Sequence, residues 1–311
     1  MSANAKPLAG LRVGISISES DDLEARGFTP SAMNRLTVRL NEALLSAGAT
    51  VVFGHDWRED GVMDAVCRSA LWSSGYPESD APPPILNLLP WPDDTRVDHE
   101  VLLRLHQIID IRSAGLPEDL EREAPRAVGN RELRRYLRSR GLTHLRRRLT
   151  EECTARICLG GRESGYQGRY PGLLEEALLA FGARQPVYLV GLLGGVAEHL
   201  GRAILELPSS RARKETSPTS SEEAGKSLED LYREHGQGEQ SSVEHSDDTL
   251  FELGRAWEVA GDLGRKRLGG NRLDRDENCR LVESRSEEEV IILVLRGLRR
   301  GFGQGTEQRQ N

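Results

Sequence analysis

Short apolar runs alternate with helical patterns along most of the chain, and this alternation constrains its fold more than any other feature. Glycine, proline or polar residues bound each run, which is typical of buried strands. We predict six strands on this basis, at 11–17, 49–53, 85–89, 107–111, 155–159 and 186–190. Strands that alternate with helices form a parallel sheet, because a crossover must return the chain to the same edge.

Helical patterns lie between these strands and continue after the last one. We expect Ser31 to cap the first helix and Gly48 to end it. Helices are predicted at 31–47, 60–70, 97–105, 132–149, 171–181, 194–205, 228–235, 250–267 and 287–300, and Pro117 begins a charged helical turn. The predicted fold class is therefore α/β: a Rossmann-like parallel sheet with flanking helices and a helical C-terminal extension.

A change of composition suggests how the chain is divided. Residues 8–206 are predicted to form the Rossmann-like domain. The stretch from Pro208 to Lys226 is rich in Ser, Thr, Glu and Pro and has almost no apolar residues, so 207–226 is predicted to be a flexible linker or loop. The helical segment 227–300 is expected to pack back onto the same domain.

Charge and composition exclude several classes of function. The formal net charge of −7 argues against a general nucleic-acid binder. Eight arginines crowd one helical region, where we favour a solvated or inter-subunit face over a nucleic-acid patch: Arg131, Arg134, Arg135, Arg138, Arg140, Arg146, Arg147 and Arg148. The four cysteines lack metal-site spacing, so we expect reduced thiols and no metal. We find no signal peptide or membrane span and expect a cytoplasmic protein.

Unusual residues follow three of the predicted strands. Because ligands bind beyond the carboxyl ends of parallel strands, these positions are candidate binding sites. Ser16 and Ser18 end the first strand, and their small hydroxyl side chains suit close approach to phosphate. The loop after the second strand offers Gly54, Asp56 and Arg58, with Trp57 as a residue that stacks on a base or packs.

The loop after the fifth strand carries the most chemistry. Its glycines allow backbone amides to converge on an anion, and Pro171 suits the first turn of the next helix. Arg162 and Arg169 can add bidentate contacts to phosphate. Glu175 and Glu176 are candidates to hold a ribose hydroxyl or to act as acid or base, although first-turn carboxylates also stabilise a helix. The ligand-binding glycines proposed here are Gly160, Gly161, Gly168 and Gly172.

Known catalytic motifs are missing from these loops. The sequence has no GxxxxGK[ST], which argues against a Walker-type NTPase, and its first loop has no GxGxxG, which argues against a standard dinucleotide dehydrogenase. It has no GxSxG nucleophile motif either.

The segments Val13–Ser18, Gly54–Gly61 and Arg169–Glu176 resemble the SLOG superfamily, the Rossmann-like group that includes LOG phosphoribohydrolases and the DNA-processing Smf/DprA proteins. Arg169–Glu176 departs from the LOG loop because it lacks the second glycine and the Gly-Thr pair. The segments 186–197 and 277–298 are similar to bacterial SLOG proteins that associate with TIR domains. That resemblance adds Gly191, Gly194 and Gly195 to the binding residues.

Three functions follow from these observations. The resemblance implies a sensor of an ADP-ribose-type nucleotide in a bacterial defence or conflict system, needing no other cofactor and acting on an effector on a separate chain. The alternatives are a LOG-like enzyme that cleaves or transfers at an N-glycosidic bond, with Glu175 or Glu176 as the carboxylate, and a non-catalytic interaction module. We favour binding over catalysis and expect a homo-oligomer without membrane or nucleic-acid partners.

Overall fold

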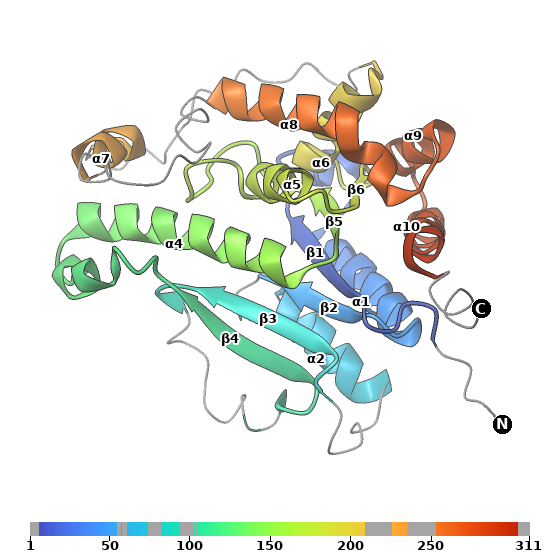
Figure 1. Ribbon diagram of the computed structural model, residues 1–311, viewed down its shortest axis with the longest axis horizontal. Coiled ribbons are helices and arrows are strands. Elements are labelled where there is room, and N and C mark those ends of the chain that lie inside the picture. Colours follow the sequence, from blue (N-terminus) through green and yellow to red (C-terminus); the bar gives the residue numbers. More distant parts are fainter. Residues whose placement is uncertain are drawn as a thin grey trace, which may run out of the picture.

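A six-stranded parallel sheet forms the centre of the computed structural model, with strand order β4-β3-β2-β1-β5-β6 (Figure 1). The structure describes residues 6–54, 57, 61–73, 82–93, 103, 105–208, 226–235 and 253–303. Each pair of neighbouring strands is parallel, which confirms the predicted fold class. The strands are β1 (Arg12–Ser18), β2 (Thr50–Phe53), β3 (Ile85–Pro90), β4 (Ile109–Gly115), β5 (Ala155–Gly160) and β6 (Val187–Val190).

The direction of winding reverses between β1 and β5. From β1 the chain adds β2, β3 and β4 on one side, then crosses back to place β5 and β6 on the other. The register pairs Val13 with Ala155 and Ser18 with Gly160, so β1 and β5 end side by side. Folds of this class bind ligands at such a reversal, beyond the carboxyl ends of the two strands.

One face of the sheet is covered by α1 (Pro30–Ser46), α2 (Val62–Ser73) and α10 (Glu287–Phe302). Odd-numbered residues of the central strands, such as Ile15 and Ile157, are buried there. The start of α1 corrects one prediction. Its cap is Thr29 and not Ser31, because the Thr29 hydroxyl accepts a hydrogen bond of 3.2 Å from the Ala32 amide and Pro30 fits the first helical position.

The opposite face is covered by α4 (Arg131–Glu152), α5 (Gly172–Gly182) and α6 (Gly195–Leu205), and α8 (Leu253–Arg267) packs over α5 and α6 (Figure 1). The expectation of a solvated arginine face on α4 is wrong for the buried Arg146, whereas Arg138 and Arg140 are partly exposed and have polar partners. Arg138 lies 2.9 Å from the Asp93 carboxylate, Arg140 donates to the Tyr136 hydroxyl at 3.2 Å, and Arg146 is buried.

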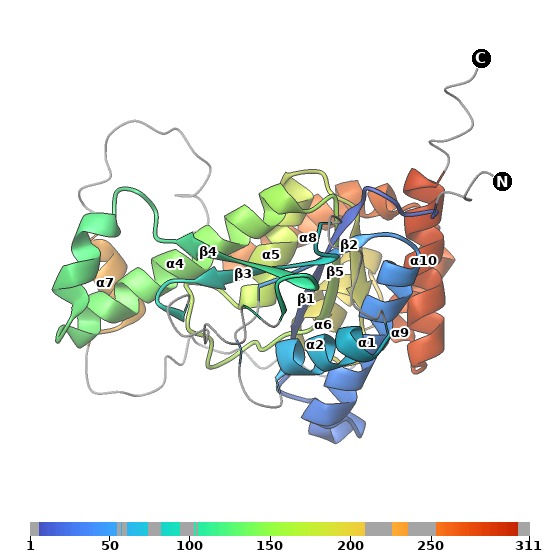
Figure 2. The same ribbon diagram turned by 90° about the horizontal axis from the view of Figure 1, so that it is seen from below.

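The helix α7 (Leu228–His235) lies beside the start of α4 in both views (Figures 1 and 2). The ring of Tyr232 packs edge-on against Tyr136, with ring centroids 5.1 Å apart. The hydroxyls of Tyr232 and Ser139 form a buried hydrogen bond of 2.9 Å. These contacts attach α7 to the same body as the sheet.

Most other differences from the sequence prediction concern boundaries. β4 begins at Ile109, because the turn before it is closed by the Ile108 amide, which bonds to the Leu105 carbonyl at 2.8 Å. The unpredicted helix α9 (Arg275–Glu283) begins with a capping box between Asp274 and Glu277. The turn predicted from Pro117 forms the 3-10 helix η3 (Glu121–Ala127). Most of the predicted helix 97–105 and of the linker 207–226 lies outside the described residues.

Candidate functional site

The carboxyl ends of β1 and β5 form the centre of the candidate site, which we call the switch-point edge. It comprises Ser18, Gly160, the loop 161–171 and the Gly194–Gly195 turn. Ser18 is exposed, whereas Ser16, two residues earlier on the same side of the strand, is buried. Ser18 can therefore meet a ligand directly, and Ser16 lies beneath the edge.

The glycines at the start of the loop allow three segments to meet closely. Gly160 and Gly161 both have positive φ angles, of 66° and 99°. A Cβ on Gly160 would overlap the Ser18 carbonyl oxygen. The Gly161 amide donates to that oxygen at 3.0 Å, and the Gly161 carbonyl accepts from the Val196 amide of α6 at 3.1 Å. These glycines therefore join β1, β5 and α6.

Two later glycines lie over a buried arginine. A Cβ on Gly168 or on Gly172 would lie 2.9 or 2.7 Å from the guanidinium nitrogens of Arg146. Arg146 forms an ion pair with Glu175, which also accepts a hydrogen bond of 2.7 Å from the Thr143 hydroxyl. The side chains of Arg146 and Glu175 are 9% and 5% exposed, so this candidate acid or base is held inside the protein.

The second candidate carboxylate, Glu176, belongs to a polar cluster against the sheet. Its Oε2 atom lies 2.8 Å from Nη1 of Arg156 and accepts a hydrogen bond from the Ser16 hydroxyl. Arg156 also donates to Ser16 at 2.8 Å. Nε and Nη2 of Arg156 are buried and have no hydrogen-bond partner among the residues that the structure describes. The cluster therefore links β1, β5 and the first turns of α5 beneath the switch-point edge.

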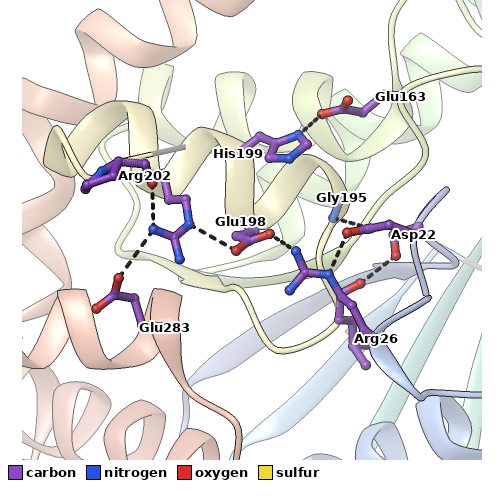
Figure 3. Close-up of polar contacts among 11 residues, drawn as sticks. Asp22, Arg26, Glu163, Gly195, Glu198, His199, Arg202 and Glu283 are labelled. Carbon is purple, nitrogen blue, oxygen red and sulfur yellow. Dashed lines mark hydrogen bonds and ion pairs between the residues drawn. The ribbon is translucent and has the colours of Figure 1, made fainter. Parts of the chain in front are cut away.

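The start of α6 is capped by a carboxylate from another part of the chain (Figure 3). Asp22 accepts a hydrogen bond of 3.2 Å from the Gly195 amide and pairs with Arg26 at 2.6 Å. Burial alone would raise the pKa of Asp22, but the hydrogen bond and charge of Arg26 hold that pKa below its ordinary value. A Cβ on Gly194 would overlap both Asp22 and Arg26.

Arg26 also joins the loop after β1 to the body of α6. It forms an ion pair with Glu198, whose other carboxylate oxygen lies 3.0 Å from Arg202 (Figure 3). Glu198 is 1% exposed, so two arginines compensate one buried charge. This network fixes the loop 19–26 against α6.

His199 forms a further contact of α6 with the site (Figure 3). Its Nδ1 atom lies 2.5 Å from the Glu163 carboxylate, and its Nε2 atom is buried with no hydrogen-bond partner in the described part of the chain. The bond to Glu163 raises the pKa of His199 above its ordinary value. The pair therefore ties the glycine-rich loop to α6 most strongly when the imidazole is protonated.

The two arginines predicted to bind phosphate have different surroundings. Nη2 of Arg162 lies 2.5 Å from Glu19, and its side chain is half exposed. The guanidinium of Arg169 lies over the Tyr232 ring, 4.7 Å from the centroid, and over Tyr170 at 5.6 Å. Arg162 thus remains at the edge, whereas Arg169 connects the loop to α7.

Other candidates are engaged in packing or fall outside the structure. A Cβ on Gly191 would overlap the Val282 carbonyl oxygen, so the glycine at this position allows α9 to pack against the end of β6. A Cβ on Gly54 would lie 2.5 Å from the Leu149 side chain of α4. Asp56 and Arg58 lie outside the described residues. Pro171 is the N-cap residue of α5, one position before the first turn in which the sequence placed it.

Sequence reasoning missed several charged residues of the site. Arg156 carries the clearest signal, because an arginine within an otherwise apolar strand needs a buried partner. The adjacent carboxylates Asp21 and Asp22 in the loop after β1 are a second signal. The others gave no signal that one sequence could reveal, because each has a partner far along the chain besides any local one: Arg26, Arg146, Glu198 and His199.

Metal-binding clusters and membrane-spanning helices are both missing from the described residues. Within the described residues, no three His, Cys, Asp or Glu side chains gather closely enough to hold a metal ion. Of the helices that the structure describes, none is long and apolar enough to cross a membrane. Burial raises the pKa of the Cys158 thiol beneath the site to about 12, so this thiol is a poor nucleophile.

The fold and this edge define a Rossmann-like α/β protein with glycine-rich loops at the reversal of its sheet. The family model described as SLOG cluster2 matches residues 7–281, and the chain belongs to this family. The match includes α7 and α8 as well as the sheet. No curated protein and no solved structure matches the chain. Membership suggests nucleotide-related binding or processing.

Proposed function

We propose that the protein binds a nucleotide at the switch-point edge, and that the ligand is of the ADP-ribose type. One observation carries the proposal: exposed Ser18 lies beside Gly160, where the winding of a parallel sheet reverses. The loop 161–171 and the starts of α5 and α6 meet at this position, because a Cβ on Gly161 would lie 3.0 Å from Leu173 of α5 and from Val196 of α6, and helix N-termini favour anionic ligands. The preference for an ADP-ribose-type ligand comes from the resemblance of the segments 186–197 and 277–298 to bacterial SLOG proteins that associate with TIR domains.

The two first-turn carboxylates favour binding over cleavage. An N-glycosidic hydrolase needs a carboxylate that reaches the sugar and exchanges a proton or forms a bond. Glu175 is buried between Arg146 and Thr143, and Glu176 accepts hydrogen bonds from Arg156 and Ser16. Both carboxylates therefore stabilise the interior. We propose a sensor that leaves its ligand intact, assembles as a homo-oligomer and acts on a separate effector chain.

One incubation tests binding and turnover together. The protein is mixed separately with AMP, ADP-ribose, cyclic ADP-ribose and NAD, its melting temperature is measured, and the same tubes are analysed by chromatography. A ligand at one hundred times its Kd stabilises the protein by about 2.7 kcal/mol, which is roughly 5–10 °C for a domain of this size. Stabilisation with intact ligand supports the proposal, whereas release of a free base would identify an enzyme.

A matched pair of variants places the ligand. Ser18→Trp fills the edge above β1 with a large ring, and we expect at least tenfold weaker binding of the stabilising nucleotide by calorimetry. Ser31→Trp introduces the same ring at an exposed position at the start of α1 and serves as the control. Equal affinity in the two variants would place the ligand elsewhere.

A further inference from the structure

The glycine-rich loop directs three hydrogen-bond donors at one oxygen atom. The amides of Glu163 and Ser164 each lie 3.2 Å from Oδ2 of Asp21, and the Ser164 hydroxyl donates to the same oxygen at 3.1 Å. Consecutive amides that converge in this way form a concave anion site. Arg162 stands directly before them and faces Glu19. The loop after β1 thus supplies the Asp21 carboxylate as the acceptor for these three donors and the Glu19 carboxylate as the partner of Arg162.

We propose that this site, which we call the Glu163–Ser164 nest, binds a phosphate of the nucleotide, and that Asp21 occupies it as an internal substitute. In the bound state a phosphate oxygen replaces Oδ2 of Asp21, and Arg162 leaves Glu19 for the same phosphate. The inference rests on the proposed function. It adds the position of the phosphate and a competitor built into the chain.

The exchange requires side chains to turn and leaves the loop in place. The neighbours of Asp21 are both anchored: the Ser20 hydroxyl donates to the buried Leu193 carbonyl at 2.5 Å, and Asp22 caps Gly195 (Figure 3). Asp21 itself is exposed. Rotation of one exposed aspartate therefore opens the nest. Because the competitor is tethered beside it, Asp21 acts at a high effective concentration.

The remaining acidic groups at this edge are neutralised by partners. Glu163 pairs with His199, whose raised pKa favours the charged imidazole, Asp22 pairs with Arg26, and Glu198 lies between Arg26 and Arg202. An arriving phosphate therefore meets few uncompensated carboxylates once Asp21 and Glu19 have turned away. A phosphate also offers more acceptor oxygens than a carboxylate, so it can contact the nest and Arg162 together.

Calorimetry of the full chain tests the exchange, with ADP-ribose and inorganic phosphate as probes. Asp21→Asn removes the competing charge and should tighten binding of both probes by about five- to twentyfold, the effect of losing a charged competitor at two or three hydrogen bonds. Ser164→Ala removes one donor and should weaken binding by about fivefold. Asp119→Asn is the control, because Asp119 is exposed and its nearest cation, Arg140, is 3.9 Å away. Far-UV circular dichroism confirms that each variant folds.

The outcomes separate this inference from the proposed function. Tighter binding in D21N together with weaker binding in S164A supports the exchange. If the unaltered protein binds ADP-ribose while D21N binds equally or less tightly, the exchange is wrong and the proposed function stands. If D21N binds phosphate but no nucleotide, the nest is an anion site and the proposed function fails. Absence of binding in every variant overturns both.

Discussion

The buried pair of Arg146 and Glu175 allows a quantitative prediction. Arg146→Met keeps an apolar stem of similar length but removes the charge that compensates a carboxylate whose side chain is 5% exposed. Glu175 would then keep the hydroxyl of Thr143 as a donor. Loss of one partner from a buried ion pair costs about 3–5 kcal/mol of folding free energy. For a domain of this size, that corresponds to a decrease of roughly 6–20 °C in melting temperature.

Urea unfolding followed by far-UV circular dichroism measures this cost, and a double variant isolates its cause. In R146M/E175Q the uncompensated charge is gone, so we expect the double variant to recover at least about 2 kcal/mol relative to R146M. Arg147→Met changes the neighbouring position on α4 and is the control. A cost below about 1 kcal/mol for R146M, or a double variant no more stable than R146M, would refute the assignment of a buried compensating charge.

Two further predictions concern packing and protonation. Gly191→Ala places a methyl group against the Val282 carbonyl of α9, so we expect the free energy of unfolding to fall by about 1–3 kcal/mol. Gly182→Ala is the control, because its methyl group would meet open space, and we expect its melting temperature to be unchanged or higher. The pKa of His199 is raised by Glu163, so the pair stabilises the fold below about pH 6.5, the unfolded value. This stability is lost as the pH rises through the folded pKa. Imidazole NMR titration should give a pKa above about 6.5 that falls in Glu163→Gln, and an equal pKa in both proteins would contradict the pairing.

The sheet was predictable because most strands are short apolar runs that residues favouring turns bound on both sides. An apolar run such as Val187–Val190 is bounded by a proline and a glycine, and its burial on both sides removes the alternation that an exposed strand would show. The carboxyl ends of five strands were predicted to within one residue for the same reason, but β4 continues past its predicted end at Ile111 to Gly115, because Arg112–Gly115 is not an apolar run. The helix α9 was missed because its short charged segment has little apolar periodicity, and its start depends on a capping box.

The partners within the site were not predictable, because each contact joins residues far apart in the chain. Arg156 meets a serine 140 positions earlier and a glutamate 20 positions later. Asp21 reaches the amides of a loop 142 positions away. Local sequence patterns indicate which residues are buried and which form turns. The pairing of charged side chains depends instead on the register of β1 against β5 and on where α4 and α6 pack.

The glycines show why a loop rich in them is an ambiguous sign of binding. Gly160, Gly191 and Gly194 are each required by a close contact within the fold, with a carbonyl oxygen or a side chain where a Cβ would stand. These contacts explain the residue type without any ligand. The Glu163–Ser164 nest differs, because its donors face an exposed side chain that can turn away. Glycines therefore mark the positions where strands and helices pack closely. A ligand site is better indicated by hydrogen-bond donors whose present acceptor, such as the exposed Asp21 side chain, can be displaced.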